Sequence, residues 1–335
     1  MKLVRIGRES DEALLRFIAS LSSSLSSRFG EALLIVQQLK QLRERRLSES
    51  AKGGCPVPTP PPRSPPPPLT PPESEQALWE KLKVVSFTHL MVGFYSFNLL
   101  HMVIRIQMHI LGRYNFLRAG RDQIDAAAEE QHNGPFSREV RGEFLSLTYN
   151  YILGDGLRSL SEALHPIVAD VLAACDHTKR LDCSTVVGLL RGVREVFEAG
   201  SEACPVPSTL VKYVMLPDHT LKTACPAAQG MLNETWDVVE SPQFAVAMTN
   251  VLDKSLDVLA DQILDTIFTP PRRHEEDGVL APVSKPMASL LTQLKPSKTV
   301  LVVDGDTPVH AEATRELLTV CNLCEAIFDS EEDTD

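Results

Sequence analysis

Apolar residues recur along most of the chain at the spacing of an amphipathic α-helix. The clearest segment opens at Ser241-Pro242 and keeps apolar residues three or four positions apart as far as Phe268. One face of an α-helix repeats about every 3.6 residues, so this spacing predicts a single buried stripe. The residues of that stripe are Phe244, Met248, Val251, Leu252, Leu259, Ile263 and Ile267.

The same spacing predicts further helices around one long central helix. Residues 76–118 contain no proline and only two glycines, so we expect one helix of about 60 Å, at roughly 1.5 Å per residue. Pro135 suits the first turn of a helix that runs to about 174, and Ser184 can cap a helix that Gly200 ends. We expect the remaining helices at 10–46, 285–295 and 311–328, with a looser stretch from Pro205 to Pro226. Signals for strands are few. The predicted fold is all-α, a single large bundle of long helices around the central one.

A proline-rich stretch separates the first helices from the rest of the chain. Eleven of the 24 prolines fall between Pro56 and Pro72. Proline fixes φ and lacks an amide donor, so the stretch predicts an extended linker, with a PxxP ligand as the alternative. We therefore divide the chain into N-terminal amphipathic helices (1–48), the linker (49–74), a helical bundle domain (75–328) and an acidic tail (329–335).

The central helix raises the question of a membrane span. Between Lys83 and Arg105 lie 21 residues without Lys, Arg, Asp or Glu, which is about the length that a bilayer requires. The run also contains polar side chains, among them His89, Asn98 and His101. Such groups are costly in hydrocarbon unless they are paired, so the pattern favours a buried helix of a soluble bundle.

Charge and cysteine usage narrow the class of protein. The formal net charge is −11, which argues against binding of a nucleic-acid backbone by the chain as a whole. Seven cysteines, an odd number and widely spaced, indicate a reducing compartment. The N-terminus lacks the apolar region and cleavage site of a secretory signal.

Three motifs have a catalytic or ligand-binding interpretation, and each has a plainer one. The run "VLVVDGDTPV" around Asp304 and Asp306 is similar to the nucleophile loop of haloacid-dehalogenase phosphatases, but only 26 residues follow it, too few for the required parallel sheet. We expect a surface turn there. The "LGDGL" sequence at 153–157 lacks the third glycine of a phosphate loop and favours a helix kink or a close helix contact. Cys321 and Cys324 have the spacing of half a zinc site without further ligands, so we expect core residues. We expect no enzyme activity, no cofactor and no metal.

Four ordered blocks resemble the peroxin-3 family of peroxisome biogenesis factors. They are "LWEKLKVVSFTHLMVGFYS" continuing into "VIRIQMHILGRYNFL", then "FLSLTYNYILGDGLRSLSEAL", "YVMLPD" and "LNETWDVVESPQFAVAMTNVLDKSL". The resemblance implies a helical domain that faces the cytosol from the peroxisomal membrane, with an N-terminal anchor. It further implies docking of peroxin-19, the chaperone of newly made peroxisomal membrane proteins, whose N-terminal amphipathic helix binds a hydrophobic groove. Those membrane proteins would thus be indirect partners. Contact with the membrane also fits this interpretation, nucleic acid does not, and a helical scaffold for a different protein is the alternative.

The resemblance also assigns the groove to residues of this chain. Trp79 is its central residue, with Leu82 packing on the ligand's apolar face and Lys83 offering charge at the rim. Leu39 and Phe116 fall where the family places other groove residues. On a helical wheel Trp79 lies at the edge of the stripe of Leu78, Leu82 and Val85, so it either anchors the core or faces outward.

The chain departs from the family pattern in three places. By the resemblance, the sequence begins near the family's first helix after the anchor, and we expect that residues 1–9 cannot span a bilayer. The proline-rich linker is an insertion just before Trp79. Ser74 and Glu75 stand where the family groove carries a basic residue.

Overall fold

The computed structural model describes residues 2–51, 74–121, 137–199, 210–269 and 283–329, with side chains described for 6–48 and 74–116 in the first two ranges. Residues 52–73 of the predicted linker, the Pro135 helix start, Gly200 and most of the acidic tail lie outside these residues, whereas residues 49–51, which were assigned to the linker, end the helix Glu31–Ala51. The described chain is all-α, which confirms the predicted fold class.

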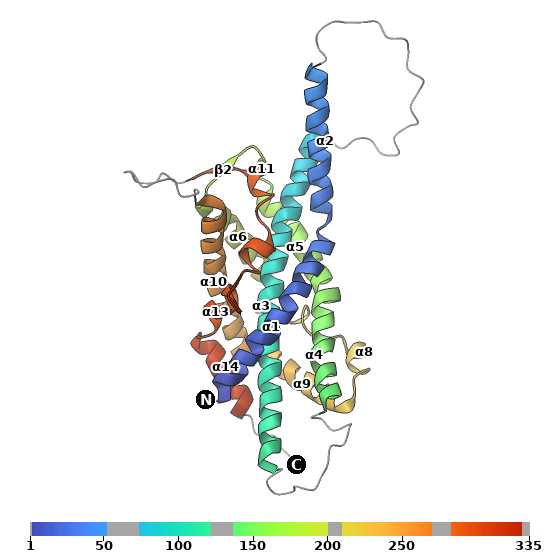
Figure 1. Ribbon diagram of the computed structural model, residues 1–335, viewed down its shortest axis with the longest axis vertical. Coiled ribbons are helices and arrows are strands. Elements are labelled where there is room, and N and C mark those ends of the chain that lie inside the picture. The colour runs from blue at the N-terminus through green and yellow to red at the C-terminus, as the bar shows by residue number, and fades with distance from the viewer. Residues whose placement is uncertain (1, 52–73, 122–136, 200–209, 270–282, 330–335) are drawn as a thin grey trace, which may run out of the picture.

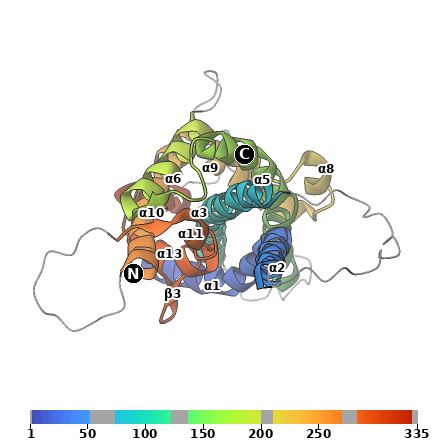
Figure 2. The ribbon, with the colours of Figure 1, turned by 90° about the horizontal axis from the view of Figure 1, so that it is seen from above.

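Long helices surround one central helix, α3, which runs the length of the molecule (Figure 1). Seen from above, α1, α2, α5, α6 and α10 lie around it (Figure 2). The longer helices are α1 (Lys2–Arg28), α2 (Glu31–Ala51), α3 (Glu75–Arg121), α4 (Arg138–Tyr151), α5 (Leu157–Leu172), α6 (Cys183–Glu198), α9 (Pro226–Glu240), α10 (Pro242–Ile263) and α14 (Leu318–Asp329). The short ones are α8 (Asp218–Leu221), α11 (Met287–Leu290), α12 (Pro296–Thr299) and α13 (Val309–Thr314), with π-helical turns η1 (Ile152–Gly156) and η2 (Leu264–Phe268).

The described strands form two antiparallel pairs of two residues each. β1 (Arg180–Leu181) pairs with β2 (Lys285–Pro286), and Arg180 lies opposite Pro286. β3 (Val303–Asp304) pairs with β4 (Thr307–Pro308), and Val303 lies opposite Pro308. Gly305 supplies the positive φ of 57° that the tight β3–β4 turn needs. Asp304 and Asp306 are exposed on this hairpin, as the surface-turn interpretation predicted.

The central helix is the core of the bundle. Every residue from 90 to 107 is buried, on all faces of the helix. Within the described residues, α3 is the helix long and apolar enough to cross a membrane, over Glu75–Phe116, and 94% of its apolar window is buried inside the molecule. A core helix of a bundle passes that test because it is covered on all sides by other helices. α1 contributes to the same core through Leu14, Leu21 and Leu25.

The predicted helices recur with changed boundaries. All seven residues of the expected stripe in α10 and η2 are buried, and Ser241 accepts a hydrogen bond from the Phe244 amide as the N-cap. The cap of α6 is Asp182 rather than Ser184, because its carboxylate accepts from the Thr185 amide at 2.8 Å. The looser stretch expected up to Pro226 ends in a helix, α9, which starts at that proline. Proline is compatible with a first helical turn because its missing amide donor is not needed there.

The "LGDGL" motif makes a close contact between backbones rather than a phosphate loop. It forms η1, and a Cβ placed on Gly156 would lie 2.2 Å from the Tyr213 carbonyl oxygen. The close approach expected from the sequence is confirmed, and only glycine fits this position.

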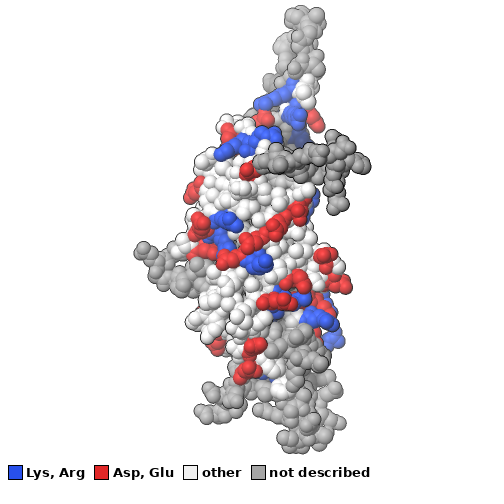
Figure 3. All heavy atoms as spheres, turned by 90° about the vertical axis from the view of Figure 1, so that its left-hand side faces the viewer, with Lys and Arg blue, Asp and Glu red and all other residues white. Residues whose placement is uncertain are grey.

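Surface charge is mixed in sign. On the described part of the face in Figure 3, Lys and Arg side chains lie among Asp and Glu side chains rather than in one basic area.

Candidate docking site at the start of the central helix

Local capping fixes where the central helix starts. The Ser74 hydroxyl accepts a hydrogen bond from the Ala77 amide at 3.2 Å, and the Ser74 carbonyl accepts from the Leu78 amide at 3.1 Å. Glu75 lies in the first turn, where a negative charge is favourable, and pairs with Arg46 of α2. Ser74 thus caps the helix just before Trp79, and Glu75 ties the same turn to α2.

Trp79 is half-buried, and its ring lies flat against a loop from a distant part of the chain. The indole stacks on the His177 imidazole with ring centroids 5.6 Å apart and planes within 3° of parallel. His177 belongs to the loop between α5 and β1. Trp79 also packs against the hydrophobic core. Both interpretations of this residue therefore hold in part: one side of the indole is anchored, and the remainder faces solvent.

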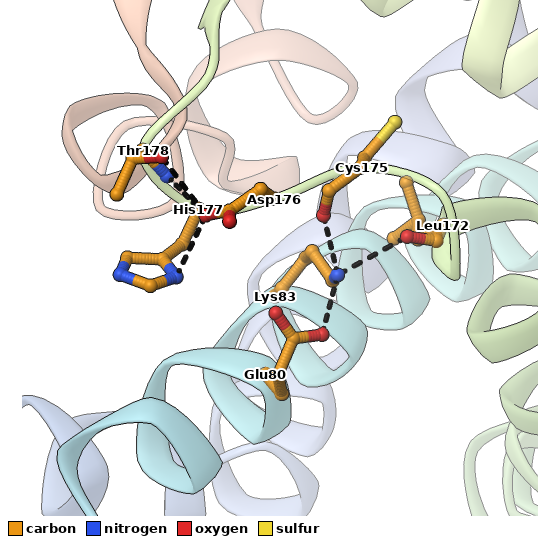
Figure 4. Close-up of polar contacts among 7 residues, drawn as sticks. All are labelled: Glu80, Lys83, Leu172, Cys175, Asp176, His177 and Thr178. Atoms are coloured by element: carbon orange, nitrogen blue, oxygen red, sulfur yellow. Dashed lines mark hydrogen bonds and ion pairs between the residues drawn. The ribbon is translucent and has the colours of Figure 1, made fainter.

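Lys83, one turn further along α3, is buried with only 1% of its surface exposed. Its Nζ donates to the carbonyl oxygens of Leu172 at 3.1 Å and Cys175 at 2.6 Å, and lies 2.5 Å from the Glu80 carboxylate (Figure 4). Leu172 is the last residue of α5 and Cys175 lies in the loop that follows, so the ammonium caps that helix at the negative end of its dipole. The expectation that Lys83 offers charge at the rim is therefore corrected, because its ammonium group is buried and bonded inside the fold.

The loop that carries His177 is held by its own hydrogen bonds. Asp176 Oδ1 accepts from the Thr178 amide at 2.8 Å and from the Thr178 hydroxyl at 3.0 Å, and lies 3.1 Å from His177 Nδ1 (Figure 4). The bonds from Thr178 are the main cause that lowers the pKa of Asp176. An ionised Asp176 thus orders the loop on which Trp79 rests.

Of the other predicted groove residues, Leu82 and Leu39 belong to this end of the molecule and Phe116 does not. Leu82 and Leu39 are buried in the core, 1% and 8% exposed. Phe116 is 45% exposed but stands 37 residues beyond Trp79 on one continuous helix, about 55 Å away at roughly 1.5 Å per residue. Phe116 contacts Phe328 of α14 instead. The grouping of Phe116 with Trp79 is corrected accordingly.

α2 places apolar surface at the same end of the molecule. It lies along the start of α3 (Figure 1) and is joined to it by the ion pair of Lys81 with Glu31, at 2.5 Å. Leu33, Leu34 and Leu47 of α2 are 60%, 59% and 63% exposed. Leu33 and Leu34 are adjacent in the sequence, whereas Leu47 lies more than three turns further along α2.

His177 and Asp176 are residues that sequence reasoning missed. They lie about a hundred positions from Trp79, and no spacing or motif joins the two segments. Their contribution depends on where the end of α5 meets the start of α3, which only the packed bundle defines.

The Cys321 and Cys324 motif forms no cluster of metal ligands among the described residues. In that part of the chain, no three His, Cys, Asp or Glu side chains converge as they would around a metal ion. Cys324 is buried, and burial raises the pKa of its thiol, which disfavours the reactive thiolate.

Comparison with known proteins places this fold. A sequence model described as Peroxin-3 matches residues 22–322. The chain is 25% identical over 261 residues to "Peroxisomal biogenesis factor 3" of Bos taurus, which covers 72% of this chain and 67% of the relative. It is 26% identical over 268 residues to the Homo sapiens protein of that name, covering 74% and 68%. It is 24% identical over 258 residues to "Peroxisome biogenesis protein 3-2" of Arabidopsis thaliana, covering 74% and 66%. The match extends from α1 to α14, and the chain belongs to the peroxin-3 family.

Proposed function

We propose that this chain acts in peroxisome biogenesis as a docking receptor for peroxin-19, at the peroxisomal membrane and on its cytosolic side. The surface around Trp79 receives an amphipathic helix of the chaperone, which brings newly made membrane proteins. The family and the names of its relatives support the role in peroxisome biogenesis. The choice of partner and site is our proposal.

The partly exposed Trp79 on a fixed support carries this proposal. A buried tryptophan covers about 150–250 Å², and a partner that covers the part of Trp79 left exposed by the fold adds an apolar gain from a single side chain. Trp79 is already oriented by His177 and by its helix, which reduces the entropy lost on binding. Tryptophans in such positions are often the residues on which an interface depends most.

Charges near Trp79 indicate which helix fits. Asp176 is exposed, and the side chain of Glu80 is 45% exposed, whereas Lys83 is buried. Asp176 and Glu80 thus place two carboxylates near Trp79, whereas Lys179 and Arg180 are exposed further along the same segment. An amphipathic helix with an apolar face and a basic residue directed at Asp176 and Glu80 complements this surface.

The test is a titration of the chaperone's N-terminal peptide against the full chain. We expect Trp79→Ala to weaken binding by about 2 kcal/mol or more, roughly a 30-fold rise in Kd, with little change in helicity. Phe116→Ala is the control, because it removes another exposed aromatic side chain from the far end of the same helix. Its Kd should equal that of the wild type.

Equal affinities of the Trp79 variant and the wild type would contradict the assignment and exclude Trp79 from the interface. If that variant also lowered the melting temperature by several degrees, the stack on His177 would be purely structural. A helical scaffold for a different protein would then be favoured.

A further inference from the structure

A charged cleft of about 770 Å³ lies far from Trp79, in the half of the molecule that holds the start of α1. Its walls come from α1, α3, α14 and the β3–β4 hairpin, and Arg105 and His109 belong to α3. Arg105 follows Trp79 by 26 residues on one helix, about 40 Å at roughly 1.5 Å per residue. The volume is within the range of about 300–1,000 Å³ found for small-molecule sites.

Arg105 is a buried cation in this cleft whose donors are not all used. Its side chain is 6% exposed, and among the described residues neither Nε nor Nη1 has a hydrogen-bond partner. Leaving these two donors without acceptors is costly, because they have lost their hydrogen bonds to water, even though the charge of Arg105 acts favourably on the Asp11 carboxylate. A ligand with an anionic group would supply the missing acceptors.

Asp11 of α1 is a buried anion in the same cleft, and one of its carboxylate oxygens lacks a donor. It is 4% exposed, and its Oδ2 accepts from Arg315 at 2.6 Å, whereas Oδ1 has no partner among the described residues. A ligand with an ammonium or hydroxyl group would supply a donor to this oxygen.

His109 adds a second acceptor to the cleft and no charge. Its Nδ1 lies 2.7 Å from the carbonyl oxygen of Arg105, which can only accept, so Nδ1 carries the proton. Nε2 is then an acceptor. Burial lowers the pKa of His109, which keeps the ring neutral at pH 7.

The rim of the cleft carries an excess of negative charge. Four carboxylates are exposed at the rim, those of Glu12, Asp306, Glu316 and Glu325. Against them stand the exposed Arg8 and the partly exposed Arg315, which pairs with Asp11 and Glu312. Such a rim attracts cations and repels simple anions. The interior cation and the acidic surroundings together select a ligand that carries both charges.

We infer that this cleft binds a small zwitterion of the amino-acid class. The anionic group, a carboxylate or a phosphate ester, lies against Arg105. The ammonium group lies toward Asp11 and the acidic rim. This site is separate from the Trp79 surface and does not depend on peroxin-19 docking.

The experiment measures binding of defined probes to the full chain by calorimetry and by thermal shift. The zwitterions are serine, lysine and phosphoserine, and the singly charged controls are acetate, inorganic phosphate and ethylammonium. We expect at least one zwitterion to bind with a millimolar or lower Kd, about tenfold or more below every singly charged probe. Absence of zwitterion binding at about 10 mM, or equal binding of acetate or phosphate, would overturn the inference.

Variants then locate the bound molecule. Asp11→Asn should raise the Kd of the zwitterion about tenfold or more and leave phosphate as tight or tighter, a reversal of preference that unfolding cannot produce. Arg105→Gln should abolish binding of the zwitterion. Arg191→Ala is the control, since Arg191 is exposed on α6 in a different cleft. Loss of binding in the Arg191 variant, or unchanged preference in the Asp11 variant, would refute the site.

Chemical protection provides a second readout that tolerates a destabilised Arg105 variant. Cys321 lines the cleft and Cys225 does not. In the wild-type chain, the bound zwitterion should slow alkylation of Cys321 by iodoacetamide and leave the rate at Cys225 unchanged, as measured by mass spectrometry. Equal rates at Cys321 with and without the ligand would count against this location.

Discussion

At the scale of single residues, two glycines of one π-helical turn have opposite environments. A Cβ on Gly156 would clash with the Tyr213 carbonyl oxygen, whereas a Cβ on Gly154 would meet no atom within 4 Å. The sequence shows both glycines in the same motif and predicts a close contact, but not which one makes it. The answer depends on the position of Tyr213, which lies in a different segment.

These environments predict opposite effects of alanine. Gly156→Ala must push the Tyr213 backbone aside, so we expect a loss of about 2–4 kcal/mol in the free energy of unfolding. Gly154→Ala is the matched control and should be neutral or stabilising by up to about 1 kcal/mol, since alanine favours helical conformation. Urea denaturation of both variants tests this. Equal stability of the two would contradict the close contact.

At the scale of elements, Lys83 links the start of the central helix to the end of α5. The helices themselves follow from periodicity: the stripe of α10 was predicted residue by residue because every member faces one core. The link between Lys83 and α5 does not follow from periodicity, because Lys83 and the carbonyl of Cys175 are 92 positions apart. From the sequence alone, a lysine is expected to be exposed because its side chain is charged. Only the packing of α5 shows why Lys83 is buried.

The link predicts that Lys83 stabilises the fold through hydrogen bonds to carbonyls. Lys83→Met keeps most of the apolar stem but leaves the carbonyl oxygens of Leu172 and Cys175 without this donor. We expect a loss of about 2–3 kcal/mol in the free energy of unfolding. Lys81→Met is the control on the same helix, since Lys81 is 46% exposed and pairs with Glu31 at the surface. It should cost about 0.5 kcal/mol or less. Similar losses in both variants would refute the capping role.

At the scale of the whole molecule, the fold class could be predicted from the sequence, whereas the shape of the docking site could not. Trp79 could be selected from its position and from the family resemblance. Its support by His177, the burial of Lys83 and the distance of Phe116 all depend on how segments far apart in the chain meet. The spacing of residues along one helix predicts which of them share a face. A groove is formed by several elements, so its prediction also requires the positions of the neighbouring helices and loops.

The buried histidines of this core connect the stability of the whole molecule to pH. His310 is fully buried, and burial is the main cause that lowers its pKa to about 4. Its Nε2 donates to the Thr299 carbonyl at 3.0 Å, and Nδ1 has no partner among the described residues. Burial also lowers the pKa of His101, with further contributions from Arg105, Arg315 and His310. Protonating either ring would put an unpaired charge into the core.

The sign of the effect follows from the protons that each state binds. Between pH 6.5, the ordinary pKa of histidine, and about 4, the unfolded chain takes up protons that the folded His310 does not. The stability that the neutral ring provides is therefore complete above this window and is lost as the pH falls through it. The contribution of each such ring approaches about 1.4 kcal/mol per pH unit. Asp11 opposes this trend at lower pH, because burial raises the pKa of its carboxyl.

A histidine variant isolates this contribution from that of the carboxylates. His310→Gln keeps an amide donor for the Thr299 carbonyl and removes the titrating ring. In urea denaturation from pH 7 to pH 5, we expect the variant to lose less stability than the wild type, by up to about 1.4 kcal/mol per pH unit. The variant should be the less stable protein at pH 7, since glutamine fills the site imperfectly, and the two curves should converge as the pH falls. Parallel curves over the whole range would show that His310 titrates alike in the folded and unfolded chains.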